Sequence, residues 1–136
     1  MSTSNVDQLA GDSPLFSGLS KKELKAVSRL LTPLTVAQGT VLTREGDLGR
    51  EAMFISSGTA SVERDGNKVA TLGPGEFFGE LALLTGARRM AMVTAETDMV
   101  IAALSRQEFA ELLDTSPKLA QKILVDAVRR LHQNAA

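Results

Sequence analysis

The distribution of glycine is the feature that most restricts the fold of this chain. Nine of its eleven glycines fall between Gly39 and Gly86, where they separate short runs rich in β-branched residues. Glycine at such intervals marks tight turns, and runs of this length are typical of antiparallel strands. The block of residues 34–105 therefore predicts a sandwich or a jelly-roll β-barrel. We expect its strands at Thr35–Val36, Val41–Thr43, Met53–Ile55, Ala60–Glu63, Val69–Leu72, Ala91–Ala95 and Val100–Leu104.

Helical patterns flank this strand block on both sides. Ser20-Lys21-Lys22-Glu23 forms a capping box that begins an amphipathic helix, and Pro33 ends it. Ser105-Arg106-Gln107-Glu108 forms a second capping box, and Ser116-Pro117 is typical of the start of a last helix. We therefore expect a mainly β fold, an antiparallel jelly-roll β-barrel with an N-terminal helix and with C-terminal helices over residues 106–134.

The expected last helix carries an apolar stripe at helical spacing. We expect this stripe to pack on the barrel, with a weak dimer through the helix as the alternative to a monomer. The stripe consists of Ala120, Ile123, Leu124, Ala127, Val128 and Leu131. Since no internal repeat divides the sequence, we expect one domain over residues 15–136 after an N-terminal tail of residues 1–14.

The composition argues against several classes of function. The 136 residues carry a net charge of −1, without the basic excess that nucleic-acid binding needs. Cysteine is absent and a single histidine cannot build a metal site or a serine triad, so we expect no enzyme. The N-terminus lacks the features of a signal peptide, and no apolar run approaches the ~20 residues that cross a bilayer. We therefore expect a cytoplasmic protein that binds neither nucleic acid nor membrane.

The segment from Gly75 to Val93 contains residues suited to a phosphate. Leu81 to Leu84 favour a short helix, whose first backbone N–H groups lack intrahelical partners and attract anions. Gly79 lets the backbone approach a ligand closely. Arg88 and Arg89 supply guanidinium groups that can grip two phosphate oxygens at once. The segment therefore predicts a phosphate site.

Glu80 adds a carboxylate to this cationic environment. A carboxylate repels phosphate but accepts a hydrogen bond from a ribose hydroxyl, as it does in dinucleotide-binding folds. In a 3′,5′-cyclic nucleotide the phosphate is tied back onto the ribose, and the 2′-OH stays available. The combination of Glu80 with the phosphate donors therefore predicts a compact sugar-phosphate ligand of this kind.

This segment resembles the phosphate-binding cassette of the cyclic nucleotide-binding domain family, whose pattern is F-G-E-L-A-L-L-x-G-x-P-R-x-A-T-V. Other segments resemble that family in the same order, namely Pro14 to Ser20, Thr43 to Asp47, Phe54 to Gly58 and Ala70 to Glu80. The resemblance covers about Leu15 to Leu131. It implies a jelly roll that acts in signal transduction as a non-catalytic regulatory domain.

The resemblance also implies roles for individual residues. Glu80 would accept a hydrogen bond from the ribose 2′-OH, and Arg89 would pair with the cyclic phosphate. Backbone amides would complete the sugar-phosphate site, those near Gly79, Leu81 and Ala82 and that of Met90 or Ala91. The family often places a side chain of the last helix over the purine, and the candidates here are Arg129, Arg130, Leu131 and His132.

Three positions in and beside the cassette bear on the ligand. Arg88 replaces the family proline, and it either strengthens phosphate binding or faces solvent. Met90 lies where some cGMP-preferring members carry a threonine that hydrogen-bonds guanine; because a thioether cannot donate, we expect cAMP, with cGMP as the alternative. Met92, where threonine is common, joins Met90 as a candidate apolar wall for the purine.

The resemblance leads to a mechanism with an unidentified effector protein as the partner. We expect phosphate capture by Arg89 to draw the cassette inward and to reposition the terminal helices, which would pack through residues such as Leu112, Leu124 and Val128. Two alternatives remain: a ligand-free interaction module with the same fold, or a regulatory fragment of a larger effector protein.

Overall fold

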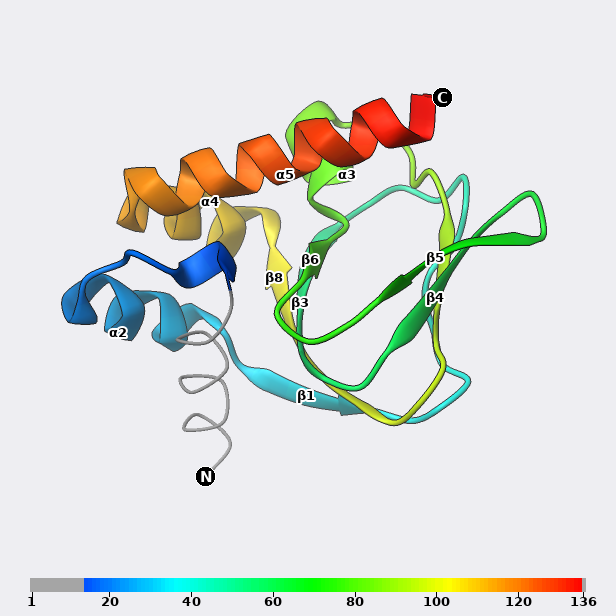
Figure 1. Ribbon diagram of the computed structural model, residues 1–136, viewed down its shortest axis with the longest axis horizontal. Helices are drawn as coiled ribbons and strands as arrows, with labels where there is room; N and C mark the ends of the chain where they lie inside the picture. Colours follow the sequence, from blue (N-terminus) through cyan, green and yellow to red (C-terminus); the bar gives the residue numbers. More distant parts are fainter. Residues whose placement is uncertain (1–13, 136) are drawn as a thin grey trace.

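The computed structural model describes residues 14–135, with the side chains of Pro14, Leu81 and residues 130–135 outside the description. The predicted tail, apart from Pro14, also lies outside the described residues. Within the described residues, a 3-10 turn, η1, and a helix, α2, come first, and two helices, α4 and α5, come last (Figure 1). These helices span η1 Pro14–Phe16, α2 Lys21–Leu30, α4 Arg106–Thr115 and α5 Pro117–Ala135.

Eight strands and one short helix lie between these helical parts. The strands are β1 Pro33–Val36, β2 Val41–Thr43, β3 Glu51–Ser57, β4 Ala60–Arg64, β5 Asn67–Leu72, β6 Phe77–Phe78, β7 Met92–Ala95 and β8 Met99–Ser105, and the helix is α3 Glu80–Thr85. They form two antiparallel four-stranded sheets with the orders β1-β8-β3-β6 and β2-β7-β4-β5. The expected fold, a mainly antiparallel β structure with flanking helices, is confirmed.

The helix starts follow from capping. Ser20 accepts a hydrogen bond from the Glu23 backbone N–H at 3.1 Å, and Glu23 accepts one from Ser20 at 2.9 Å. Ser105 forms the same reciprocal pair at the start of α4. Ser116 Oγ accepts from the backbone N–H of Leu119, as expected of an N-cap before Pro117. All three predicted helix starts are confirmed.

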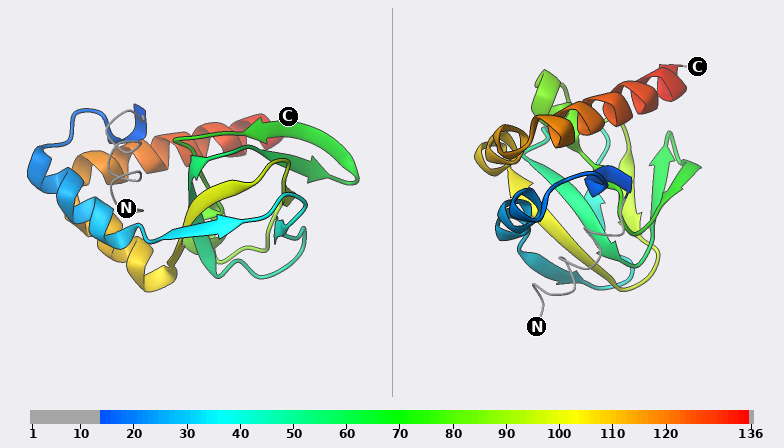
Figure 2. Two further views of the ribbon diagram at one scale, coloured as in Figure 1. Left: turned by 90° about the horizontal axis from the view of Figure 1, so that it is seen from below. Right: turned by 60° about the vertical axis from the view of Figure 1, so that its left-hand side comes forward.

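Two apolar clusters hold the layers together. One lies where α2, α4 and α5 meet the sheet that contains β3, and it includes the packed rings of Phe16, Phe54, Phe77 and Phe109. The other lies between the two sheets and includes Ile55, Val93 and Met99. The helices thus gather at one end of the β structure, and α5 runs back past α3 (Figure 2).

The structure corrects two expectations. The two-residue strand β6 was not predicted, because Phe77 and Phe78 lie inside the cassette segment. Leu124 and Val128 do not pack on the barrel: they are 47% and 64% exposed. The buried face of α5 instead carries Leu119, Ile123 and Ala127, three positions four residues apart, so Leu124 and Val128 lie on the flank of the helix.

Candidate functional site

A cavity of about 740 Å³ lies between α3, the segment that follows it and strands β4, β5 and β7. Three arginines line it, Arg64, Arg88 and Arg89, and most of the other lining residues are apolar. The lining residues are Thr43, Val62, Arg64, Val69, Ala70, Thr71, Leu72, Glu76, Phe78, Gly79, Glu80, Ala82, Thr85, Ala87, Arg88, Arg89, Met90, Ala91 and Val93. This mixture suits a ligand that has a charged part and a flat apolar part.

Helix α3 brings its N-terminus to this cavity. Gly79 is the N-cap and has a φ of 83°, in the left-handed region that favours glycine. Gly86 ends the helix with a φ of 72°, and its N–H donates to the Ala82 carbonyl. The first backbone N–H groups of a helix have no intrahelical partners, so this end of α3 supplies donors beside the cavity.

Glu80, the first residue of α3, contributes a buried carboxylate to the cavity wall. Its side chain is only 1% exposed. A buried carboxylate is stabilised by neighbouring donors and cations, and Arg89 supplies part of this effect through its attraction to Glu80. The carboxylate therefore lies in the cavity wall and is largely shielded from bulk solvent.

Arg89 is a half-buried cation that holds the site together. Its Nη1 donates to the Gly79 carbonyl at 3.0 Å, and its Nη2 donates to the Glu51 carbonyl at 2.8 Å. Burial lowers the pKa of Arg89 from its ordinary value, while Glu51 and Glu80 act in the opposite direction. A guanidinium remains charged at neutral pH, so this partly desolvated cation would interact strongly with an anion.

The backbone packs tightly around the Arg89 guanidinium. A Cβ added to Gly79 would lie 2.5 Å from Arg89 Nη1. A Cβ added to Gly49 would lie 2.3 Å from the Cβ of Ala82 and 3.1 Å from Arg89 Cζ. Glycine is therefore needed at both positions, and the path of the Arg89 side chain is fixed by its surroundings.

Hydrogen bonds to the turn at Gly46 and Asp47 hold the backbone of Arg89 in place. The Arg89 N–H donates to the Asp47 carbonyl at 2.7 Å, and the Gly46 N–H donates to the Arg89 carbonyl at 2.9 Å. Arg88 is exposed at the cavity rim, where its Nη1 donates to the Gly46 carbonyl at 3.0 Å. The turn at Gly46 and Asp47 thus fixes the register of Arg88 and Arg89.

Most of the predicted site residues converge on the cavity. Those that line it are Gly79, Glu80, Ala82, Arg88, Arg89, Met90 and Ala91. Leu81 lies in α3, and its side chain is outside the description. Met92 is not among the lining residues, because side chains alternate along β7 and Val93 takes the inward position.

Arg129, the candidate of the last helix whose side chain the structure describes, is not among the residues that line the cavity. Arg129 is exposed on α5. The side chain of Arg130 falls outside the described residues, as do those of Leu131 and His132. The predicted purine contacts from α5 therefore stay predictions.

The wall formed by β4 and β5 was not predicted from the sequence. Val62 and Arg64 come from β4, and residues 69–72 come from β5. The alternation of Val62 and Arg64 along the strand was a usable signal. However, the pairing of β4 with β7, which brings this wall to the cassette, is a long-range feature that no local pattern gives.

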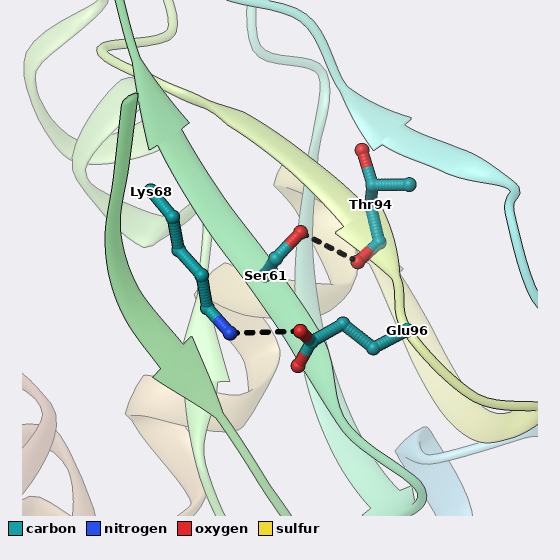
Figure 3. A network of polar contacts seen from close by, with 4 residues as sticks. All are labelled: Ser61, Lys68, Thr94 and Glu96. Atoms are coloured by element: carbon teal, nitrogen blue, oxygen red, sulfur yellow. Dashed lines mark hydrogen bonds and ion pairs between the residues drawn. The ribbon is translucent and has the colours of Figure 1, made fainter. Parts of the chain in front are cut away.

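Side-chain bonds reinforce the sheet behind this wall (Figure 3). Ser61 Oγ on β4 donates to the Thr94 carbonyl on β7 at 3.5 Å. Lys68 on β5 pairs with Glu96 at 2.8 Å, just after β7. None of these four residues lines the cavity, so their contribution is to hold β4, β5 and β7 in place.

Comparison with known families identifies the type of domain. Residues 33–116 match the cyclic nucleotide-binding domain. The chain belongs to this family. It is 37% identical over 123 residues to a cyclic nucleotide-gated potassium channel of Rhizobium etli, a match that covers 90% of this chain and 34% of the channel. The chain thus spans about a third of the length of that relative.

Similar solved structures support the assignment to the cyclic nucleotide-binding domain family. The catabolite activator protein of Thermus thermophilus is 32% identical, with a TM-score of 0.81 over 90% of this chain and 60% of that one. The regulatory domain of Toxoplasma gondii PKA, solved with cAMP, is 32% identical, with a TM-score of 0.69 over 81% of this chain and 44% of that one. Both likenesses confirm the expected jelly-roll fold.

No helix in residues 14–135 is both long enough and apolar enough to cross a membrane. In the same part of the chain, no group of three or more histidine, cysteine, aspartate or glutamate side chains is placed to hold a metal ion.

Proposed function

We propose that this domain is a non-catalytic sensor that binds a 3′,5′-cyclic nucleotide, with cAMP as the preferred ligand, and regulates an effector protein. The observation that carries the proposal is the convergence of Arg89, the N-terminus of α3 and the buried Glu80 on one cavity. A cation, backbone donors and a carboxylate match the phosphate and the ribose hydroxyl of such a ligand.

The phosphate would bind between Arg89 and the start of α3. Arg89 now donates to two backbone carbonyls, which carry only partial charge. A phosphate oxygen is a stronger acceptor, so it would compete for at least one guanidinium edge. The backbone amides of Leu81, Ala82 and Met90 or Ala91 would provide further donors. Arg88 at the rim would add a weaker, solvent-screened contribution.

The ribose would bind to Glu80. Its carboxylate oxygens only accept hydrogen bonds, so it selects a ligand with a hydroxyl near the phosphate. Because the side chain is 1% exposed, a ligand hydroxyl would meet a largely dehydrated acceptor. Loss of a hydrogen bond in such a dehydrated site weakens binding more than loss of the same bond in water.

Two observations support cAMP as the ligand. Met90 lines the cavity, and its thioether cannot donate a hydrogen bond to guanine. The Toxoplasma gondii relative was solved with cAMP, at 32% identity. The wall of Val62, Ala70 and Leu72 would pack on the purine face.

The route from the cavity to the terminal helices starts at α3. Arg106, the first residue of α4, donates through Nη1 to the Leu83 carbonyl of α3 at 3.1 Å. Helix α4 in turn packs on α5 and on α2. A movement of α3 on phosphate capture would therefore pull on α4 and reposition α5. Ligand shifts this equilibrium only as far as it binds one arrangement more tightly.

Thermal unfolding with ligand tests the proposal. At ~100 times its dissociation constant, cAMP should stabilise the domain by about 2.7 kcal/mol, a shift of about 10 °C at this chain length. AMP, whose phosphate is not cyclised, should give a much smaller shift. The absence of a shift with cAMP and with cGMP would favour the alternative, an interaction module that uses the same fold without ligand.

A further inference from the structure

Arg64 is a cationic side chain of the cavity to which the phosphate and ribose sites assign no role. It lies on β4 two residues after Val62, so the two side chains share a strand face, and both line the cavity. Arg64 Nε donates to the Met90 carbonyl at 3.3 Å. Its guanidinium therefore lies beside the segment that follows Arg89, on the wall formed by β4.

The segment that holds the backbone of Arg89 also contacts the end of the strand that carries Arg64. Arg64 pairs with Asn67 across the turn from β4 to β5, and the next N–H, that of Asp65, donates to Glu45 Oε1 at 3.2 Å. Glu45 precedes Gly46, whose N–H donates to the Arg89 carbonyl. A pre-positioned guanidinium loses less conformational entropy on binding than a mobile one.

The arrangement of the cavity indicates which part of a nucleotide would reach Arg64. If Arg89 and α3 hold the phosphate and Glu80 holds the ribose, the base is the part left to reach the wall of β4 and β5. Val62 and Ala70 on this wall suit the face of a flat ring. Arg64 is the cation on this wall, and a cation with several N–H donors suits the edge of a base.

We propose that Arg64 reads the edge of the base and gives the pocket affinity for 6-oxopurines such as guanine. The free edge of guanine presents two acceptors, O6 and N7, and arginine binds this pair bidentately. The same edge of adenine presents one acceptor, N7, beside the N6 amino donor. Since a guanidinium only donates, it gains two hydrogen bonds from guanine and one from adenine.

This inference rests on the proposed cyclic nucleotide receptor, and it makes cGMP a second ligand of the same pocket. A thioether at Met90 supplies no donor to guanine. The donors for O6 and N7 would come from the Arg64 guanidinium on β4, so this contact needs no donor at Met90. cIMP tests the contact by itself, because hypoxanthine keeps O6 and N7 but lacks the guanine amino group.

The competing role for Arg64 is structural. Its bond to the Met90 carbonyl links β4 to the cassette, and loss of this link would loosen the site for every nucleotide. The two roles therefore predict different ratios between the affinity for 6-oxopurine nucleotides and the affinity for cAMP. A structural role lowers all affinities together, whereas base reading lowers those for 6-oxopurines.

Titration calorimetry with cAMP, cGMP and cIMP distinguishes these roles. We expect Arg64→Leu to weaken cGMP and cIMP by about tenfold each and cAMP by less than about threefold. Arg64→Lys keeps the charge but lacks the planar fork, so it should lose most of the same preference and serves if the leucine variant does not fold. Arg29→Leu, on the exposed side of α2, is the control and should change none of the three affinities.

Each outcome decides a different claim. A selective loss of cGMP and cIMP affinity supports base reading by Arg64. Equal losses for all three ligands, or no loss, overturn it while the receptor function stands. If the wild-type protein binds none of the three nucleotides, the proposed function itself fails, and this inference fails with it.

Discussion

Replacement of Gly79 by alanine tests whether the N-cap of α3 positions Arg89. Gly79 has a φ of 83°, and its carbonyl accepts from Arg89 Nη1 at 3.0 Å. An added Cβ would lie 2.5 Å from that nitrogen and 3.0 Å from the Glu51 carbonyl oxygen. The Glu51 backbone belongs to β3 and cannot move freely, so Arg89 has to leave its place.

The expected cost has two parts. A left-handed backbone costs a residue with a Cβ roughly 1–2 kcal/mol. Displacement of the guanidinium breaks its hydrogen bonds to the Gly79 carbonyl, which is part-buried, and to the Glu51 carbonyl, which is exposed; this adds about 1.5 kcal/mol. Gly79→Ala should therefore lower the free energy of unfolding by about 3 kcal/mol. At roughly 4 °C per kcal/mol, the melting temperature should fall by about 12 °C.

Gly18→Ala is the matched control. Gly18 also has a φ of 83°, but a Cβ added there meets nothing within 4 Å. This variant should lose only the backbone part, about 1.5 kcal/mol or 6 °C. Its affinity for cAMP should stay within about twofold of the wild type, whereas Gly79→Ala should bind at least tenfold more weakly.

Denaturant unfolding and calorimetric titration of both variants check this reasoning. The reasoning is wrong if Gly79→Ala and Gly18→Ala lose equal stability and equal affinity. Such a result would mean that Arg89 adapts to the added methyl group without loss, and that its contacts with Gly79 and Glu51 do not set its position.

Four further substitutions test the roles of Arg89, Arg88, Glu80 and Glu23. Arg89→Ala should weaken cAMP binding by at least a hundredfold and Arg88→Ala by less than about fivefold, because only Arg89 is half-buried; equal losses would refute this assignment. Glu80→Gln should weaken cAMP but not 2′-deoxy-cAMP, and equal effects on both would make Glu80 structural. Hydrogen bonds from Ser116 and the Ser20 backbone lower the Glu23 pKa from 4.5. Glu23→Gln should therefore reduce the melting temperature at pH 7, with a difference that disappears as the pH falls below 4; a constant difference from pH 7 to pH 3 would contradict this linkage.

Local patterns in the sequence were sufficient to predict most of the helices and strands. Capping boxes fixed the starts of α2 and α4, because these motifs act within four residues of the chain. Glycine spacing located seven of the strands, and β6 was missed because two residues make no periodic pattern. Elements whose signal is local could be predicted, and those without one could not.

The face of α5 and the far wall of the cavity depend on long-range packing. The apolar stripe on α5 was so wide that the sequence did not show which part of it would be buried. Contacts of α5 with η1 and α4 bury the face that contains Leu119. The cassette residues could be predicted because they are adjacent in sequence. Arg64 lies 25 residues before Arg89, and only the pairing of β4 with β7 brings it to the same cavity.

Calorimetric titration of the wild-type protein with cAMP shows whether the cavity is a cyclic nucleotide site. We expect one site per chain and binding that is at least tenfold weaker for AMP, which lacks the cyclic phosphate. We also expect that Arg89→Ala abolishes the heat signal while the variant still unfolds cooperatively. Binding of cAMP and AMP with equal affinity, or a heat signal that survives Arg89→Ala unchanged, would contradict a cyclic nucleotide site built on Arg89.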